Sequence, residues 1–294
     1  MLVIDEKNCG LYLQKLEQIG KKIPLMQRGY SLGDEKIFIN GICLHNIESG
    51  KTFFSTKKVL GKGAFGEVLV CVEVKTGVHY ALKSQRYYKS IVENQVEGNK
   101  LFGKDSEIYG PWIDEKASVA YIVTPLAQTS LLSYLNASAR KLAPKELLLM
   151  VLLIAKNLKE IHAKGKVHCD LKLDNILLYE DKKAGLFIVK ISDFGTMKDK
   201  GDQGRTINAD HRVYSHYPPE YFLTVTGKQI FTVDPSFDVW SFGKLLKHLS
   251  QFTTSIDIYL NPLVAHCCLP DKSARINMDK AIKYLETARS SFFA

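Results

Sequence analysis

The sequence lacks the long hydrophobic run that a membrane helix would need. Its longest uninterrupted apolar stretch, Leu147 to Ala155, is far shorter than the roughly 20 residues that cross a bilayer. The N-terminal residues MLVIDEKNCG contain acids and no basic stretch followed by an apolar core, so no secretory signal is predicted. We therefore expect a protein without a membrane span that is cytoplasmic, or located in the host cytosol if a pathogen encodes it.

Paired cysteine motifs are missing too. The chain has six cysteines, but no CxxC spacing repeats and two of the six are adjacent, which argues against a zinc site or a disulfide framework. We expect reduced thiols at all six positions: Cys9, Cys43, Cys71, Cys169, Cys267 and Cys268.

Long runs of one charge are absent as well. The net charge of +9 would suit an acidic partner such as nucleic acid or anionic lipid, yet no run of five basic residues occurs. An ordinary soluble surface is the preferred interpretation, and no specific nucleic-acid site is predicted. With 294 residues, 46% of them hydrophobic, the chain is long enough for two lobes or domains.

The first 52 residues differ in pattern from the rest. Apolar residues between positions 11 and 19 recur at helical spacing, and the segment 37–44 alternates like short strands. This segment is either an extension packed on the following domain or an element that docks a partner. The apolar stripe favours packing, because such stripes usually face a core.

A glycine-rich motif follows, with the pattern GxGxxGxV between Val59 and Val70. Glycines let the backbone approach a phosphate closely, and free N–H groups there can bind anions. A Rossmann turn shows the same glycine spacing but leads into a helix, whereas Glu67 to Glu73 alternates like a strand. The motif therefore predicts a strand, turn and strand hairpin.

A second alternating run ends at Lys83, where an ordinary surface lysine is the alternative to a phosphate-binding one. A helix is predicted from Ser90 to Phe102, and its acids Glu93 and Glu97 lie one turn apart. Either acid could pair with Lys83. Further along, residues 120–127 predict a strand that leaves into a linker, and Pro144 begins a helix that is apolar almost all round.

The stretch from His168 to Asn175 concentrates polar chemistry. Asp170 could orient an attacking hydroxyl, Lys172 could steady a moving phosphoryl group, and Asn175 could bind a metal ion. Alone, this octapeptide is also typical of a solvated turn. Two predicted strands follow, at 176–179 and 186–191, then Asp-Phe-Gly at 193–195, a polar loop, Pro-Pro-Glu at 218–220, and helices from residue 236 onward.

Taken in order, these motifs resemble the eukaryotic-type protein kinase family, of the Ser/Thr type because lysine follows Asp170-Leu171. The resemblance covers about Val59 to Leu285. It implies an α+β, two-lobed fold with a β-rich N-lobe, a helical C-lobe and ATP between them. The corresponding division is an N-terminal extension at 1–52 packed on or near the N-lobe, an N-lobe at 53–126 and a C-lobe at 127–294.

The resemblance also implies roles for single residues. Lys83 would hold the α and β phosphates with Glu97 as its ion-pair partner and Glu93 in reserve, and Thr124 would be the gatekeeper. Asp170 and Lys172 would serve phosphoryl transfer, while Asn175 and Asp193 would bind Mg²⁺. Asp238 would brace the catalytic loop, and Glu220 would pair with Arg275. The residues that would surround ATP are Leu60, Gly61, Gly63, Gly66, Val68, Ala81, Lys83, Thr124, Pro125, Ala127 and Leu177.

Departures from the family pattern qualify these expectations. Cys169 stands where relatives have an arginine that contacts activation-loop phosphate, so obligatory loop phosphorylation is not expected. Val213 stands at the usual threonine position, which bears on the choice of hydroxyl. Asp174 resembles an acid that some relatives use for basic substrates. We expect a Ser/Thr protein kinase using ATP and Mg²⁺; a pseudokinase scaffold or a kinase of small molecules remains the alternative.

Overall fold

The structure is a computed structural model that describes residues 2–4, 25–26, 30–32, 35–39, 41–55, 58–63, 66–103, 107–137, 143–181, 186–205, 214–222, 230–252 and 257–291, without side chains before Gly41. The chain divides into two compact units. The first comprises residues 1–96 and 105–126, and the second comprises residues 97–104 and 127–294.

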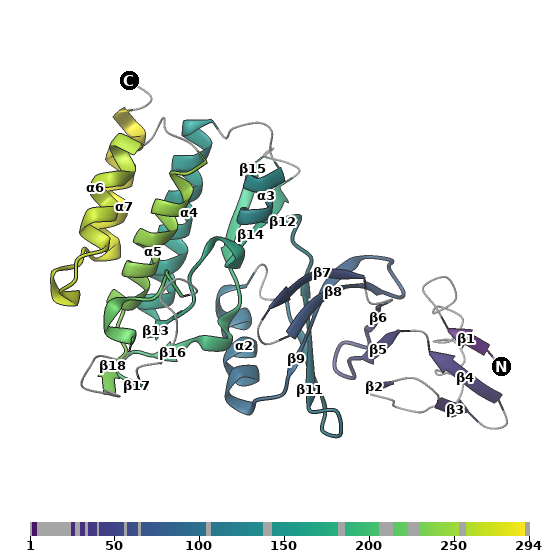
Figure 1. The fold of residues 1–294 in the computed structure, drawn as a ribbon. Coiled ribbons are helices and arrows are strands. Elements are labelled where there is room, and N and C mark those ends of the chain that lie inside the picture. The colour runs from purple at the N-terminus through teal and green to yellow at the C-terminus, as the bar shows by residue number, and fades with distance from the viewer. Residues whose placement is uncertain are drawn as a thin grey trace. The chain divides into compact units, whose positions relative to one another are not determined.

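The first unit is built around an antiparallel sheet (Figure 1). Its strand order is β10-β11-β9-β8-β6-β5-β2, and β7 pairs with β8 beside this path. The strands that carry the expected nucleotide residues are β7 (Val59–Gly63), β8 (Gly66–Glu73), β9 (His79–Arg86) and β11 (Val119–Pro125), and β10 spans Tyr109–Asp114. The predicted glycine hairpin is therefore confirmed as the β7–β8 pair.

Alternation along these strands separates two faces of the sheet. Leu69, Leu82 and Val123 lie in register across β8, β9 and β11 and are fully buried in one aromatic-rich cluster. Their neighbours along each strand point to the opposite face, because side chains alternate in a strand. That opposite face carries Ile122, which packs with Val92 of α2 (Lys89–Phe102).

The segment before the glycine hairpin continues the same sheet. Strands β5 (Ile42–His45) and β6 (Thr52–Ser55) form a hairpin, and β6 pairs with β8. Lys51 forms an ion pair with Glu107 at 2.9 Å, which ties this segment to the sheet by charge as well. The other strands near the N-terminus are β1 (Leu2–Ile4), β2 (Leu25–Met26), β3 (Tyr30–Leu32) and β4 (Glu35–Ile39).

The second unit is mainly helical. Helix α4 (Pro144–Ala163) begins with proline at its first turn, as predicted, and buries Leu147, Val151 and Ile154 completely. Helix α5 (Ser236–Leu249) packs against it, while α6 (Asp257–Cys267) lies along α5 and α7 (Met278–Ser291) lies along α4 (Figure 1). A short helix, α3 (Leu131–Ala137), precedes α4.

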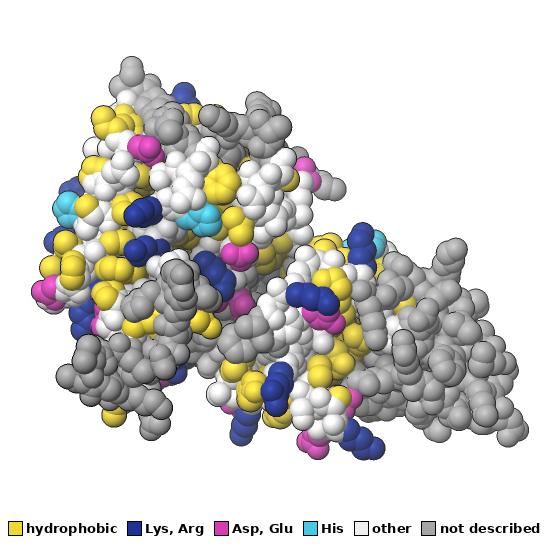
Figure 2. Space-filling model, viewed as in Figure 1, with side chains coloured by type: hydrophobic (Ala, Val, Ile, Leu, Met, Phe, Trp, Pro, Cys, Tyr) yellow, Lys and Arg dark blue, Asp and Glu magenta, His cyan; other side chains and the backbone are white. Residues whose placement is uncertain are grey.

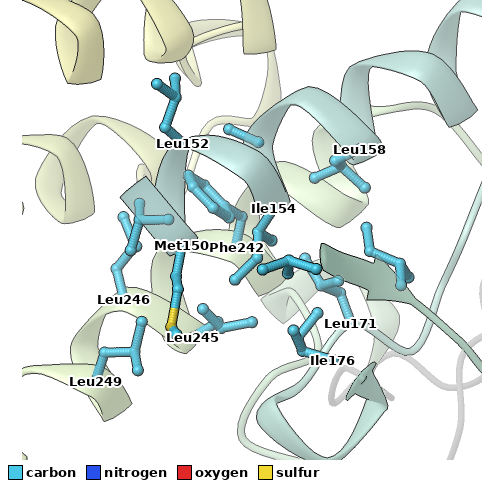
Figure 3. Close-up of a cluster of buried hydrophobic side chains, with 14 of the residues drawn as sticks. Met150, Leu152, Ile154, Leu158, Leu171, Ile176, Phe242, Leu245, Leu246 and Leu249 are labelled. Atoms are coloured by element: carbon cyan, nitrogen blue, oxygen red, sulfur yellow. The ribbon is translucent and has the colours of Figure 1, made fainter. Parts of the chain in front are cut away.

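The core of this unit reaches residues 168–175, which contain the predicted catalytic residues and are hereafter the catalytic stretch. Figure 3 shows Met150 and Ile154 of α4 facing Phe242 and Leu245 of α5, with Leu171 in the same cluster. Leu171 is fully buried and Leu173 is nearly so, and the two flank Lys172 in the chain. The apolar residues of the stretch 168–175 therefore anchor it in the core.

Short strands and turns complete the second unit. The predicted strands are observed as β14 (Ile176–Asp181) and β15 (Leu186–Ile191), which pair antiparallel. The remaining elements are β12 (Thr129–Ser130), β13 (Lys166–Val167), η2 (Leu173–Asn175), η3 (Phe194–Thr196), β16 (Lys198–Asp199), β17 (Gln203–Arg205), η4 (Pro219–Tyr221), β18 (Ile230–Thr232) and η5 (Lys272–Ala274).

The surface carries its positive charge in a dispersed form. On the face shown in Figure 2, lysine and arginine side chains lie singly among apolar, acidic and uncharged ones. Within the described part of the chain, no helix is both long and apolar enough to cross a membrane.

Candidate active site

The backbone of the catalytic stretch is held by a buried carboxylate of α5. Asp238 is 0% exposed, and its two oxygens accept hydrogen bonds from the backbone N–H groups of His168 (2.7 Å) and Cys169 (2.9 Å). His162 of α4 donates a further hydrogen bond at 2.9 Å. Burial opposes the charge of Asp238, but these bonds outweigh it and lower its pKa. The expected bracing contact is therefore present.

His168 connects the stretch to the strand that precedes Asp193. Its Nε2 donates to the backbone oxygen of Ser192 at 3.0 Å, and its Nδ1 accepts from the N–H of Asp170 at 3.2 Å. A neutral imidazole has one donor and one acceptor, and both are used here. The ring also stands edge-on to Phe194, with centroids 5.4 Å apart, and Phe194 contacts Phe102 of α2 in turn.

Asp170 lies at the centre of a set of hydrogen-bond donors. Lys172 Nζ bonds to its Oδ2 at 2.7 Å, and Asn175 Nδ2 bonds to the same oxygen at 3.0 Å. His216 Nε2 lies 2.8 Å from the other oxygen, Oδ1. Burial raises the pKa of Asp170, yet the bond from His216 and the charge of Lys172 prevail and lower it to about 2. Asp170 is consequently a carboxylate at neutral pH.

Asn175 and Asp193 are neighbours across the β14–β15 hairpin. The pairing of Ile176 with Ile191 places Asn175 opposite Ser192, whose N–H and hydroxyl both donate to the Asn175 backbone oxygen. Asn175 Nδ2 gives both of its hydrogens to Asp170, which directs its amide oxygen away from that residue. An amide oxygen and a carboxylate are ligands that suit Mg²⁺, so this donor set fits the expected ion.

Two backbone conformations mark the same region. Cys169 and Asp193 both have φ of 64°, in the left-handed region that residues with a side chain rarely adopt. Such a conformation costs of order 1–3 kcal/mol and persists only where surrounding contacts impose it. The bonds from Asp238 to the backbone of the catalytic stretch are contacts of this kind.

Cys169 is packed as an apolar side chain. It is buried in a cluster with Val167, Val233 and Phe237, against which Tyr217 and two further aromatic residues pack. Burial raises the pKa of the Cys169 thiol well above its ordinary value, so the thiol stays protonated. The side chain at position 169 is thus enclosed by apolar groups.

The glycine hairpin contrasts with these buried groups. Leu60 is 49% exposed, and a Cβ built on Gly61 or Gly63 would meet no atom within 4 Å. A Cβ on Gly66 would instead lie 2.1 Å from the backbone oxygen of Ser84, so this glycine is required by the packing of β8 on β9. Among the described residues, nothing places such a requirement on Gly61 or Gly63.

The expected nucleotide residues of the first unit share one face of the sheet. Val68 lies opposite Lys83 in the β8–β9 pair, and Ala81, two residues along, lies opposite Thr124 of β11. Directly opposed residues and residues two apart project to the same side of a sheet. Pro125 is the last residue of β11, and it needs no N–H to present its carbonyl oxygen.

Ala127 and Leu177 belong to the second unit. Ala127 lies in the linker, and the next residue, Gln128, donates its N–H to the backbone oxygen of Leu178 at 2.9 Å. Leu177 is half-buried between the buried residues Ile176 and Leu178, so it points away from the core side of β14.

The partner of Lys83 on α2 differs from the prediction. Lys83 Nζ donates to Gln95 Oε1 at 2.8 Å, and Gln95 is 3% exposed. Glu97 instead pairs with Lys166 at 2.7 Å, and Glu93 pairs with Lys89 on the helix surface. Residues 95 and 97 are about 200° apart around a helix, so they occupy opposite sides of it. The predicted ion pair between Glu97 and Lys83 is therefore not seen among the described contacts, and the partner of Lys83 on α2 is the uncharged Gln95.

Glu97 belongs to a different polar cluster. Lys166 Nζ bonds Glu97 at 2.7 Å and Asp199 at 3.0 Å, and Lys166 lies directly opposite Asp199 in the β13–β16 pair. Burial opposes the charge of Lys166, but its two acidic partners raise its pKa overall. One lysine thus joins the C-terminal half of α2 to the strand before the catalytic stretch and to the segment after Asp193.

Comparison with known protein families identifies this arrangement. Residues 54–258 match the protein kinase domain, which is about two thirds of the chain. The chain belongs to the protein kinase family. The expected α+β, two-lobed kinase fold is likewise confirmed.

Individual kinases are similar over the same region. The Aurora kinase of Schizosaccharomyces pombe is 30% identical over 201 residues, covering 65% of this chain and 52% of the relative. A probable serine/threonine-protein kinase of Streptomyces coelicolor is 28% identical over 65% of this chain and 29% of the relative. A tyrosine- and threonine-specific cdc2-inhibitory kinase of Drosophila melanogaster is 24% identical over 79% and 48%, respectively. The chain therefore spans about half or less of the length of these relatives.

The expected ion pair between Glu220 and Arg275 is present. Arg275 donates to both carboxylate oxygens of Glu220, at 2.7 and 2.8 Å, and its side chain is fully buried. This two-pronged geometry suits a guanidinium and a carboxylate. The pair fixes the end of the segment to the helical unit beyond residue 258, where the domain match ends.

Val213 and the helix expected between residues 11 and 19 lie outside the described residues. So does Thr206, whose hydroxyl in the polar loop before Pro218 is a candidate for phosphorylation. Three residues of the kinase site were not singled out from the sequence: Gln95, Lys166 and His216. The spacing of Gln95 could have indicated its position, because it lies three residues after Val92 and three before Gly98, on the buried face of α2. His216 lies in an irregular segment, and no local periodicity indicates its contact with Asp170.

Proposed function

We propose that this chain transfers the γ-phosphoryl group of ATP to serine or threonine hydroxyls of protein substrates. The observation that carries the proposal is the carboxylate of Asp170, which is held by Lys172 and Asn175 within a stretch anchored to Asp238. Phosphoryl transfer requires little covalent chemistry from the protein, so positioning and charge stabilisation account for most of the catalysis.

In the proposed reaction, Asp170 accepts a hydrogen bond from the substrate hydroxyl and takes its proton as the oxygen attacks phosphorus. Its low pKa makes it a weak base, which suits proton transfer late in the reaction. Lys172, whose Nζ lies 2.7 Å from Asp170, supplies a positive charge beside the transferred group. The chain thus orients the nucleophile and stabilises charge at adjacent positions.

Asn175 and Asp193 would hold Mg²⁺ through their side-chain oxygens. Among the described residues, no group of three or more His, Cys, Asp or Glu side chains could bind a metal ion alone. Mg²⁺ commonly takes one or two protein ligands and completes its shell with water and phosphate oxygens. When bound, the ion would neutralise charge on the phosphates.

Nucleotide binding is assigned to the glycine hairpin, to Lys83 and to the residues expected around adenine. The open backbone of Gly61 and Gly63 supports a role in covering phosphates, because no packing requirement explains these glycines. Lys83, oriented by Gln95, would contact the α and β phosphates. Gly66 is assigned to the phosphates with the other two glycines. The adenine-site assignments are Leu60, Val68, Ala81, Thr124, Pro125, Ala127 and Leu177.

We further propose that the kinase does not require phosphorylation of its activation segment, the loop between residues 193–195 and 218–220. Two observations support this: Cys169 is enclosed by apolar groups, and Lys166 already joins Glu97 to Asp199. In this arrangement the side chain of Asp199 places a negative charge beside Lys166 without any modification of the chain. A phosphate group would otherwise have to supply such a charge. Exposed Asp174 would favour basic residues near the acceptor hydroxyl.

The transfer assay uses the full chain with labelled ATP, Mg²⁺ and generic protein substrates. We expect transfer to serine or threonine, and a loss of at least about 100-fold in Asp170→Asn, which keeps the shape but not the charge. Asp279→Asn, on the surface of α7, is the matched control and should retain activity. Tight ATP binding without transfer by the unmodified chain would overturn the proposal.

Independence from phosphorylation is tested with two variants. The double variant Thr206→Ala, Ser215→Ala should stay within about tenfold of the unmodified chain, near 1.4 kcal/mol in barrier height. Lys166→Met should lose more than the double variant, whereas Lys159→Met, which removes an exposed ion pair of α4, should have little effect. Phosphatase treatment that abolishes activity would contradict this part of the proposal.

An ATP-binding scaffold without transferase activity is the second candidate. One observation favours it: the partner of Lys83 on α2 is the uncharged Gln95 and not the predicted acid. The same transfer assay separates the two functions. A scaffold would bind nucleotide equally well in the unmodified chain and in Asp170→Asn, and neither would transfer phosphate.

We propose the division into an N-terminal extension at 1–52, an N-lobe at 53–126 and a C-lobe at 127–294. The boundary between the compact units at Leu126 supports the second division. The pairing of β6 with β8 and the Lys51–Glu107 ion pair support an extension packed on the N-lobe. Docking of a partner by this extension remains a hypothesis, which binding assays with and without residues 1–40 would test.

A further inference from the structure

The contact between His216 and Asp170 is not explained by the roles assigned so far. His216 lies in the segment 214–222, and its Nε2 is 2.8 Å from Asp170 Oδ1. An ionised carboxylate only accepts hydrogen bonds, so Nε2 carries the hydrogen and donates it. Both side chains are largely buried, at 15% exposed for His216 and 10% for Asp170, which shields the bond from competing water.

The backbone of His216 is anchored to α5. Ser241 Oγ donates to the His216 backbone oxygen at 2.7 Å, and Ser241 is 0% exposed. Asp238, which accepts hydrogen bonds from the backbone N–H groups of His168 and Cys169, lies one turn earlier on the same helix. Residues three apart share one face of a helix. A single helix face therefore fixes both the donor and the acceptor of this bond.

The imidazole ring is also oriented by aromatic neighbours. It stands against Tyr217 with ring centroids 4.5 Å apart, and Tyr217 packs on Tyr221 and on Phe237 of α5. Edge-to-face contacts of this kind restrict ring rotation. The ring thus has a defined direction before any substrate is present.

The bonds to Asp170 are divided unequally between its two oxygens. Oδ2 accepts from both Lys172 and Asn175, whereas Oδ1 accepts from His216 alone among the described residues. A carboxylate oxygen has about two acceptor sites. The acceptor site that is left for a substrate hydroxyl is consequently on Oδ1, the oxygen whose direction His216 sets.

We propose that His216 is a positioning residue that orients Asp170 Oδ1 toward the substrate hydroxyl. The inference rests on the proposed kinase activity and adds a residue to it. His216 acts through Asp170 and need not touch the substrate or ATP. Its removal should therefore lower kcat while leaving the KM for ATP nearly unchanged.

The test compares two amide side chains of different reach. His216→Gln places its amide nitrogen at the same number of bonds from Cβ as Nε2, whereas the amide of His216→Asn ends at the position of Nδ1. We expect kcat within about threefold for the glutamine variant and a loss of about tenfold or more for the asparagine and phenylalanine variants. The KM for ATP should change by less than threefold in all of them.

Controls separate positioning from loss of structure. His248→Gln and His248→Asn change an exposed histidine of α5 and should retain full activity. Thermal unfolding of each variant is measured beside its kinetics. If His216→Phe fails to fold, the glutamine and asparagine pair carries the test.

Each outcome has a defined meaning. Transfer by the unmodified chain with equal kcat in the glutamine and asparagine variants overturns the inference and leaves the proposed function in place. Higher kcat in His216→Phe also overturns it, because His216 would then obstruct Asp170. Absence of transfer by the unmodified chain overturns the proposed function, and the inference with it.

Discussion

The glycine hairpin, which is proposed to bind phosphates, and the catalytic stretch, which is proposed to carry out phosphoryl transfer, are built in opposite ways. The hairpin strand β7 is exposed along its whole length, and Gly61 and Gly63 have open space beside them. In the catalytic stretch, His168, Asp170 and Asn175 are buried and bonded to one another or to α5. One region presents backbone to a ligand, and the other holds side chains in fixed directions.

The difference follows from what each region has to do. A backbone that covers phosphates needs close approach and few fixed neighbours, which glycine provides. A carboxylate that orients a nucleophile needs its direction set in advance, because small errors in geometry raise the reaction barrier. We therefore expect substitutions in the catalytic stretch to affect stability and turnover together, and those at Gly61 or Gly63 to affect nucleotide binding alone.

The largest effect should come from removing the carboxylate that holds the catalytic stretch. Asp238→Ala leaves two buried N–H groups and His162 without their acceptor, so we expect the free energy of unfolding to fall by about 3–5 kcal/mol and transfer to be lost. Asp238→Asn, which keeps one acceptor oxygen, should lose less. Denaturant unfolding measures both, with Asp279→Ala as a surface control expected within about 0.5 kcal/mol.

The pH dependence of stability tests the same contact. The pKa of Asp238 is lowered on folding, so its contribution is fully present above the ordinary aspartate value of 3.8 and is lost as the pH falls through the folded-state pKa. Stability of the unmodified chain should therefore decline more steeply below that pH than stability of Asp238→Asn. Parallel curves would contradict the assignment.

A smaller effect should distinguish the glycines from one another. Gly66→Ala forces a Cβ onto the backbone oxygen of Ser84, and we expect a loss of about 1–3 kcal/mol in the free energy of unfolding. Gly61→Ala and Gly63→Ala should change stability by no more than about 1 kcal/mol but raise the KM for ATP. Equal destabilisation by all three would break the comparison with the catalytic stretch.

The smallest effect should come from removing the hydrogen bond between Gln95 and Lys83. Gln95→Met removes the partner of Lys83 without removing bulk, and a lost hydrogen bond of about 1 kcal/mol corresponds to roughly a fivefold rise in the KM for ATP. Gln95→Glu should restore binding to near the original value or better, because it supplies a charged partner. Glu97→Gln is the comparison variant, and an equal effect on this KM would restore Glu97 as the relevant acid.

The order of motifs along the chain was sufficient to predict the family and most elements. The roles of Asp238 and Glu220 came from the family resemblance. The hairpin at 59–70, the apolar helix after Pro144 and the paired strands after Asn175 followed from residue types and periodicity. These features are local, since each depends on a short stretch whose pattern has a period of two or 3.6 residues. Family resemblance then linked them into one fold.

Only the tertiary structure decided which side chains meet. Glu97 and Gln95 are both on α2. The orientation of this helix about its own axis decides that Gln95 bonds to Lys83 and that Glu97 pairs with Lys166. His216 reaches Asp170 because α5 holds the two segments side by side, although 46 residues separate them in the chain. Such pairings depend on the packing of distant elements, and no local periodicity contains that information.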